Sequence, residues 1–219
     1  MPEPEFQIFE CTNPVCHFRC PNNLTLRKMD RCPLCGGQFI PQGRPFSNHK
    51  LSAPHKYLQR ANNCIVEVVL DNLRSTLNVG SIFRTADGAG VNHIYCCGTT
   101  PTPQHPKIAK TSLGAEGFLP WSYSPNALDV IREKRTKGSL VFSLEATPAA
   151  RSIFSRSDKI HNQSTLLVVG NEISGVDPDI LTESDDILFI PMAGQKTSLN
   201  VAVAFGIAIY SLVNMNKSV

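Results

Sequence analysis

The sequence predicts an α/β protein: a parallel sheet with helices on both faces, preceded by a small cysteine-rich segment. Short apolar runs rich in β-branched residues recur from residue 65 onward, and segments with helical spacing separate them. Such runs are apolar throughout, which is typical of parallel strands that are covered on both sides. Five of the eight cysteines fall within residues 11–35, which marks that stretch as a separate structure.

The elements follow from this pattern in chain order. We expect strands at residues 65–70, 93–97, 140–144, 166–169 and 187–190. We expect helices at residues 78–89, 125–137, 149–154, 178–183 and 198–214, with Asn78 and Ser198 as the N-caps of the first and last. Residues 98–121 read as a long loop, which is more often functional than structural.

Composition limits the class of protein. The chain has 219 residues, of which 42% are hydrophobic and 18% charged, as in a globular protein. No run reaches the roughly 18 apolar residues that a membrane span needs. The first residues show neither a basic start nor an apolar core of a signal peptide, so we expect a cytoplasmic protein without a membrane contact.

Charge is uneven along the chain. Residues 1–63 carry a net charge of +4, and residues 64–219 carry −1. A basic N-terminal segment followed by a near-neutral remainder of the chain points to a contact with a polyanion near the N-terminus, although a solvated surface can have the same charge by chance.

The cysteine cluster points to a metal. Cys32 and Cys35 form a CxxC pair followed by two glycines, and a second pair precedes it. That pair is either Cys11 with Cys16 or Cys16 with Cys20. Because no secretion signal is present, disulfides are the weaker interpretation, and four thiolates suit Zn²⁺. A metal would also stabilise a segment too short to build a core, whereas a metal-free arm is the alternative.

Three stretches carry a family resemblance. They are residues 78–90 (NVGSIFRTADGAG), residues 166–175 (LLVVGNEISG) and residues 187–210, which read as strand, tight loop and helix. In this order, and with this spacing, they resemble motifs 1, 2 and 3 of the SpoU/TrmH family of RNA ribose 2′-O-methyltransferases, in the SPOUT superfamily. The resemblance covers roughly residues 66–213.

The resemblance implies a fold, a methyl donor and an assembly. The family's parallel sheet ends in a C-terminal trefoil knot, and the family acts as a homodimer whose active site uses both subunits. Its donor, S-adenosylmethionine, is bound mostly through backbone groups of the knot loops. On this sequence those positions are Gly170, Ile190 and Leu199, with Leu144 beside them.

The resemblance also implies catalytic residues: Arg84 from motif 1, Glu172 from motif 2 and Asn200 from motif 3. Because Ile82, Phe83 and Ala86 surround Arg84 in the sequence, we expect it to be buried, facing the knot and paired with Glu172 or an RNA phosphate. In the family this arginine is the candidate for removing the proton of the ribose 2′-OH. That role is chemically awkward, since the guanidinium of arginine stays protonated in proteins. A phosphate clamp that orients the 2′-OH is the alternative.

Acceptor contacts are expected from two places. Asn78 belongs to motif 1 and Ser198 to motif 3, and Lys107 and Lys110 lie in the long loop that resembles the family's substrate-side loop. At the N-terminus, the stretch from Cys11 to Arg19 resembles a zinc-ribbon knuckle found ahead of such methyltransferases. It favours Cys11, Cys16, Cys32 and Cys35 as the ligands.

The sequence therefore predicts three parts: a zinc ribbon at residues 1–40, a linker at 41–63 and a methyltransferase domain at 64–219. The predicted function is S-adenosylmethionine-dependent 2′-O-methylation of a ribose in tRNA or rRNA. A non-catalytic RNA-binding module of the same fold and a methyltransferase acting on an RNA base are the alternatives.

Overall fold

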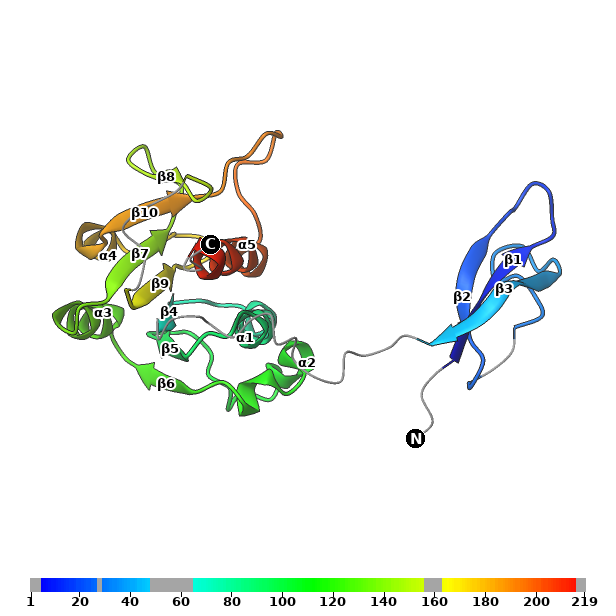
Figure 1. Cartoon of the computed structure of the whole chain (residues 1–219), viewed down its shortest axis with the longest axis horizontal. Helices are drawn as coiled ribbons and strands as arrows, with labels where there is room; N and C mark the ends of the chain where they lie inside the picture. Colours follow the sequence, from blue (N-terminus) through cyan, green and yellow to red (C-terminus); the bar gives the residue numbers. More distant parts are fainter. Residues whose placement is uncertain (1–4, 27–28, 48–64, 156–162, 216–219) are drawn as a thin grey trace. The chain divides into compact units, whose positions relative to one another are not determined.

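The computed structural model describes residues 5–26, 29–47, 65–155 and 163–215. They form two compact units, one on each side of residues 48–64, and each unit is described by itself (Figure 1). The linker expected at 41–63 lies mostly outside the described residues. None of the helices that the structure describes is long and apolar enough to cross a membrane.

The C-terminal unit is built on a seven-stranded sheet in the order β6-β5-β4-β9-β7-β10-β8, and every neighbouring pair is parallel. The strands are β4 (Val66–Asp71), β5 (His93–Cys97), β6 (Trp121–Ser124), β7 (Leu140–Leu144), β8 (Arg151–Ser152), β9 (Thr165–Val169) and β10 (Asp186–Phe189). All five strands predicted from the sequence are confirmed, with ends shifted by at most one residue.

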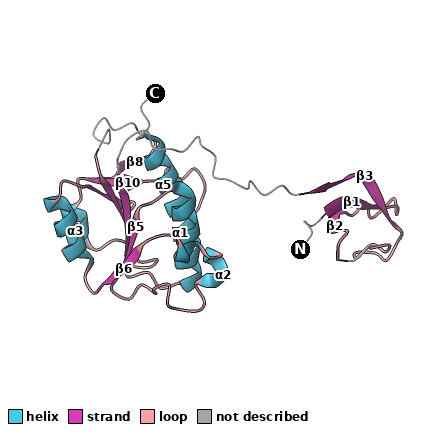
Figure 2. Ribbon diagram, turned by 60° about the horizontal axis from the view of Figure 1, so that its bottom comes forward, coloured by secondary structure: helices cyan, strands magenta, loops and turns pink. Residues whose placement is uncertain are grey.

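Helices cover both faces of this sheet (Figure 2). They are α1 (Thr76–Ala89), α3 (Ala127–Thr136), α4 (Pro178–Glu183) and α5 (Val201–Met215). Alternation along β4 explains the two layers: Val68 and Leu70 pack with α1 and α5, whereas Val69 packs with α3 and α4. Because strand side chains alternate between faces, apolar residues at every position fit a sheet that is buried on both sides.

The strand order creates a binding edge. From β4 the chain adds β5 and β6 on one side, whereas β9, β7 and β10 lie on the other, with β9 inserted directly beside β4. In open α/β sheets, ligands bind at the carboxyl ends of the strands where the order reverses. The carboxyl ends of β4, β9, β7 and β10 are neighbours here, so the loops that follow them meet at one edge.

Two predictions in this unit are wrong. Residues 149–154 form no helix, because β8 pairs there with the sheet edge at β10. The loop predicted at 98–121 contains the short helices α2 (Ala109–Ser112) and η2 (Ala115–Gly117) and ends in β6. Mixed polarity hides β6 in the sequence, since only one face of this edge strand is covered.

Both predicted N-caps are also displaced. Ser75 caps α1, and its hydroxyl accepts the N–H of Asn78 at 3.3 Å, so Asn78 lies inside the first turn. The last helix begins at Val201 rather than near Ser198, and the Asn200 side chain accepts the N–H of Ala202 at 2.9 Å. Ser, Thr, Asp and Asn all serve as caps, and tertiary contacts decide which of several candidates is used.

The N-terminal unit is an antiparallel sheet in the order β2-β1-β3. Its strands are β1 (Glu5–Cys11), β2 (Arg19–Asn23) and β3 (Phe39–Ser47). Phe9, Cys11, Cys32 and Phe39 form its small core. Because β3 continues to Ser47, the boundary expected at residue 40 is displaced toward the C-terminus.

Candidate functional site

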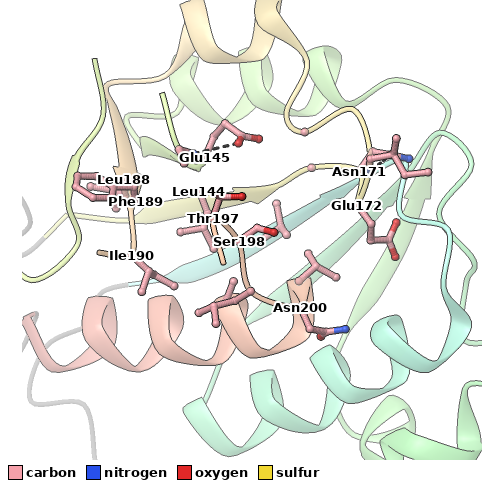
Figure 3. Close-up of a pocket in the computed structure, with 18 of the residues that line it drawn as sticks. Leu144, Glu145, Asn171, Glu172, Leu188, Phe189, Ile190, Thr197, Ser198 and Asn200 are labelled. Atoms are coloured by element: carbon pink, nitrogen blue, oxygen red, sulfur yellow. Dashed lines mark hydrogen bonds between the residues drawn. The ribbon is translucent and has the colours of Figure 1, made fainter. Parts of the chain in front are cut away.

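A cavity of about 500 Å³ opens at the carboxyl edge of the sheet (Figure 3). The loops after β7, β9 and β10 and the start of α5 line it, so segments that are far apart in the sequence meet there. The residues expected from the sequence that line it are Asn78, Leu144, Gly170, Glu172, Ile190, Ser198, Leu199 and Asn200. All four positions expected to bind the donor therefore share one cavity.

Gly170 is required by the shape of its own loop. A Cβ at this position would lie 2.5 Å from the carbonyl oxygen of Gly175 and from the backbone of Val176. Asn171 and Gly175 exchange two backbone hydrogen bonds of 3.0 Å, which close the loop tightly over Gly170. Gly170 was expected to bind the donor through its backbone, and the structure shows that the chain itself also approaches this glycine closely.

Glu172 joins this loop to the start of α1. Its carboxylate accepts hydrogen bonds from the N–H groups of Arg74 (2.9 Å) and Ser75 (3.1 Å) and from Nδ2 of Asn78 (3.0 Å). Burial acts to raise the pKa of Glu172, but these hydrogen bonds outweigh it and hold the pKa below its ordinary value. Negative charge at a helix N-terminus is also favourable.

Asn200 extends the network to the third segment. Its Nδ2 group donates to Oδ1 of Asn78 at 3.1 Å, while its Oδ1 caps α5. Glu172, Asn78 and Asn200 thus form a continuous chain of hydrogen bonds across the mouth of the cavity. Since all three come from different motifs, the network fixes the relative positions of the three segments.

Arg84 lies elsewhere. We expected Arg84 to be buried and paired with Glu172 or an RNA phosphate. The expected burial is wrong, because its side chain is exposed and does not line the cavity that contains Glu172. Ile82, Phe83 and Ala86 are buried, and helical geometry places Arg84 on the opposite side of α1. It lines a second, shallow pocket with Lys110, Thr111 and Tyr210.

The second pocket brings together two residues for which the sequence predicted a role toward the RNA acceptor. Arg84 and Lys110 come together there, whereas Lys107 is exposed and is not among the residues that line the pocket. Gly80 brings them together, because a Cβ there would lie 2.1 Å from Thr111 Oγ1 and 2.5 Å from the Ile108 carbonyl oxygen. Sequence reasoning missed Gly80, although a glycine inside a helical pattern is a signal of close packing.

Glu145 is a second residue that sequence reasoning missed. It follows β7 directly and lines the first cavity, and its carboxylate accepts the N–H of Val176 at 2.9 Å. A polar residue immediately after a buried strand in an α/β pattern is the signal that would have found it.

In the N-terminal unit, the sulfur atoms of Cys11, Cys16, Cys32 and Cys35 all lie within 4.8 Å of one another. Cys20 is outside this group. Two of the contacts are 3.4 Å (Cys11 to Cys35) and 3.8 Å (Cys16 to Cys32). Sulfur atoms about 2.3 Å from a tetrahedral zinc lie roughly 3.8 Å apart, so the donor set fits this metal.

Backbone groups also point at the sulfur atoms. The N–H groups of Asn13, Phe18 and Gly37 are hydrogen-bonded to Cys11, Cys16 and Cys35, each from two residues further along the chain. The bond from Gly37 is the main reason that the pKa of Cys35 is lowered to about 7. Such bonds stabilise thiolates, the form in which cysteine binds metals.

The fold and the first cavity define an α/β protein with a ligand site at the carboxyl edge of a parallel sheet. The model of the SpoU rRNA Methylase family matches residues 65–210, about two thirds of the chain. The chain belongs to this family.

Two bacterial enzymes are similar to this chain in sequence. The tRNA (guanosine(18)-2′-O)-methyltransferase of Aquifex aeolicus is 33% identical over 147 residues, which are 65% of this chain and 66% of that protein. The 23S rRNA (guanosine(2553)-2′-O)-methyltransferase RlmP of Bacillus subtilis is 30% identical over 145 residues, 66% of this chain and 56% of that protein. This chain thus aligns with somewhat less than two thirds of each relative.

A solved structure has a similar fold. The AdoMet-bound rRNA methyltransferase of Sinorhizobium meliloti superposes with a TM-score of 0.65 and 26% identity, covering 84% of this chain and 67% of that one. Two relatives are thus 2′-O-methyltransferases by name, and one similar structure holds the donor.

Proposed function

We propose that this protein transfers a methyl group from S-adenosylmethionine to the 2′-oxygen of a ribose in tRNA or rRNA. One observation carries the proposal: the three motif segments of a SpoU family chain converge on one cavity and are joined there by Glu172, Asn78 and Asn200. The proposal is therefore supported by the positions of these residues in the structure as well as by sequence similarity.

The cavity fits the donor. Leu144, Ile190 and Leu199 offer apolar contacts, and the loops at Gly170 and after Ile190 offer backbone groups for a purine and a ribose. S-adenosylmethionine supplies an activated methyl group on a positively charged sulfur. A C-terminal trefoil knot, in which α5 closes the cavity, belongs to the proposal, and the contribution of α5 to the lining supports it.

The acceptor fits the second pocket. Arg84 and Lys110 supply two positive charges, and hydroxyl groups of Thr111 and Tyr210 surround them. Guanidinium and ammonium groups bind RNA phosphates strongly, so this pocket would hold the acceptor backbone and orient the 2′-OH. The exposure of Arg84 favours the role of a phosphate clamp over that of a base, which is consistent with its permanent charge.

A homodimer would join the two pockets. Within one chain, Arg84 does not line the donor cavity, so a complete site needs the partner's Arg84. Leu77 on α1 and Val203 on α5 are 53% and 52% exposed and border a shallow groove with Gly206 and Ile207. Apolar side chains around small residues suit an interface between two copies of this chain.

The N-terminal unit would hold one zinc ion through Cys11, Cys16, Cys32 and Cys35. The support is the tetrathiolate grouping in a unit whose core contains few large side chains. Zinc would supply folding stability there, and the basic front of the chain would contact RNA.

The test uses purified protein, methyl-labelled donor and RNA from cells that lack the protein. Complete nuclease digestion of the product should place the label on a 2′-O-methylated nucleoside. A label on a base would show a base methyltransferase, and RNA binding without transfer would show a non-catalytic module. Mapping the modified nucleotide then identifies the tRNA or rRNA.

A further inference from the structure

The donor cavity has an unbalanced charge. Among the described residues that line it, Glu145 and Glu172 are the charged ones, and none is lysine, arginine or histidine. A partly enclosed pocket with two carboxylates and no cation favours a positively charged ligand over a neutral one of the same shape.

Glu145 holds its charge in a fixed place. Its backbone N–H pairs with the carbonyl of Leu188 at 2.9 Å, which anchors it beside β10. Its carboxylate accepts hydrogen bonds from Ala146 N (3.0 Å) and Val176 N (2.9 Å). Gly175 has a φ of +76°, and a Cβ there would lie 2.4 Å from Glu145 Oε2, so the loop packs directly on the carboxylate.

The two carboxylates have different partners. Glu172 accepts three hydrogen bonds and joins the motifs at the start of α1. Glu145 lies in the loop after β7, beside the apolar contacts expected for the donor, and Figure 3 shows both at the cavity. Hydrogen bonds from neutral N–H groups distribute the charge of Glu145 but do not remove it.

The proposed reaction changes the charge of the bound molecule. As the methyl group forms its bond to the ribose oxygen, the bond from sulfur to methyl breaks and the hydroxyl proton leaves. The sulfonium becomes the neutral thioether of S-adenosylhomocysteine. Donor and product therefore differ by one methyl group and one positive charge.

We propose that Glu145 is a specificity-determining residue that makes the cavity prefer the sulfonium donor over its thioether product. The inference rests on the proposed function, since it requires S-adenosylmethionine as the donor. Its consequence is weaker product inhibition, because the charge that attracts the donor has no counterpart in the product.

Calorimetry on the full chain tests this with S-adenosylmethionine and S-adenosylhomocysteine as separate ligands. Glu145→Gln keeps the size of the side chain and removes its charge. We expect the variant to bind the donor about two- to fivefold more weakly, a charge effect at a partly exposed site, and the product with unchanged affinity. Glu133→Gln, at an exposed position of α3, is the matched control, because it changes the net charge by the same amount at a site away from the cavity.

Other results would overturn the inference. Equal weakening of both ligands would mean that Glu145 secures the loop at Val176 or contacts the ammonium group that both ligands share, and unchanged binding of both would mean that its charge has no effect on either ligand. In wild-type protein, the preference for the donor over the product should shrink as the salt concentration is raised. This measurement does not depend on whether the variant folds. A preference that is independent of salt contradicts the proposal. Absence of donor binding to wild type would instead refute the proposed function.

Discussion

A single carboxylate, that of Glu172, joins segments nearly a hundred residues apart. It accepts from the backbone of Arg74 and Ser75 and from the side chain of Asn78. A group that accepts several hydrogen bonds at such a junction favours one arrangement of the loops, because a displacement breaks these bonds together.

The pKa of Glu172 gives a pH-dependent prediction. Because hydrogen bonds hold the folded-state pKa below the ordinary 4.5, folding favours the carboxylate. The contribution of the ionised Glu172 to stability is complete above the ordinary pKa of 4.5 and is lost as the pH falls through the folded-state pKa. Because the Glu172 side chain is exposed, solvent screens part of this effect, and Glu172→Gln should lower stability at pH 7 by about 0.5 kcal/mol. The difference in Tm from wild type should narrow as the pH falls below 4.5.

Thermal unfolding followed by circular dichroism at several pH values provides the measurement. Glu5→Gln, at an exposed position on β1, is the control and should give a small, constant difference. A difference for Glu172→Gln that does not change with pH would show that its charge makes no contribution.

Arg84 gives the sharpest prediction about mechanism. It is exposed in the second pocket, so Arg84→Ala should leave donor affinity unchanged and lower methyl transfer by orders of magnitude. Arg84→Lys keeps the charge but loses the planar fork. Substantial activity of the lysine variant indicates a phosphate clamp, whereas near-zero activity indicates a need for guanidinium geometry or proton transfer.

Single-turnover rates and calorimetry with the donor measure these effects. Arg132→Ala on α3 removes an exposed arginine paired with Glu183 and should retain activity. Full activity of Arg84→Ala would exclude Arg84 from the mechanism.

At the scale of elements, α1 connects the two pockets. One end of α1 carries Asn78 at the donor cavity, and Arg84 lies further along the helix at the second pocket. α2 packs against α1 at Gly80, where Thr111 Oγ1 also donates to the Leu77 carbonyl at 3.1 Å. The position of Lys110 therefore depends on a helix contact that has no room for a side chain.

Gly80→Ala should separate these helices. Overpacking at this contact should cost about 1–3 kcal/mol and displace Lys110 from Arg84, which weakens RNA binding more than donor binding. Gly88→Ala is the control on the same helix, because its Cβ would meet only the end of the Tyr210 side chain, at 3.1 Å. Denaturant unfolding and RNA titration measure the two effects, and equal behaviour of both variants would contradict the proposed packing role.

At the scale of the whole molecule, the proposed zinc site predicts that the N-terminal unit needs a metal to fold. Metal analysis of freshly purified protein should show about one zinc per chain, which Cys32→Ser combined with Cys35→Ser should abolish. The double variant should bind RNA more weakly and the donor normally. Cys20→Ser should keep its zinc, because Cys20 lies outside the sulfur cluster. Zinc-free wild-type protein would refute the site.

Complementation between subunits tests the proposed homodimer with a shared active site. Arg84→Ala lacks the clamp, and Leu199→Arg blocks the donor cavity, so each homodimer should be inactive. Mixed dimers keep one complete site, and random mixing of equal amounts should restore about a quarter of wild-type activity. A mixture that stays inactive, although exchange of subunits is shown by light scattering or labelled chains, would exclude an active site built from both subunits.

The sequence by itself determined the parallel sheet, because β-branched runs that are apolar at every position fit only strands covered on both faces. It also predicted that the positions expected to bind the donor lie together, since the loops at the carboxyl ends of neighbouring strands meet at one edge, where these residues line one cavity. Its cysteine spacing left two choices for the first pair, and the resemblance to a zinc-ribbon knuckle favoured the four cysteines whose sulfur atoms cluster in the structure, with Cys20 outside.

Only the tertiary structure decided what depends on packing between distant segments. It placed Arg84 beside Lys110 and away from Glu172, because an arginine among apolar neighbours in sequence can still face solvent on a helix. It chose Ser75 and Asn200 as caps from several suitable residues. It also brought Glu145 to the donor cavity, since the contact with Val176 spans 31 positions of the chain and no local pattern encodes it.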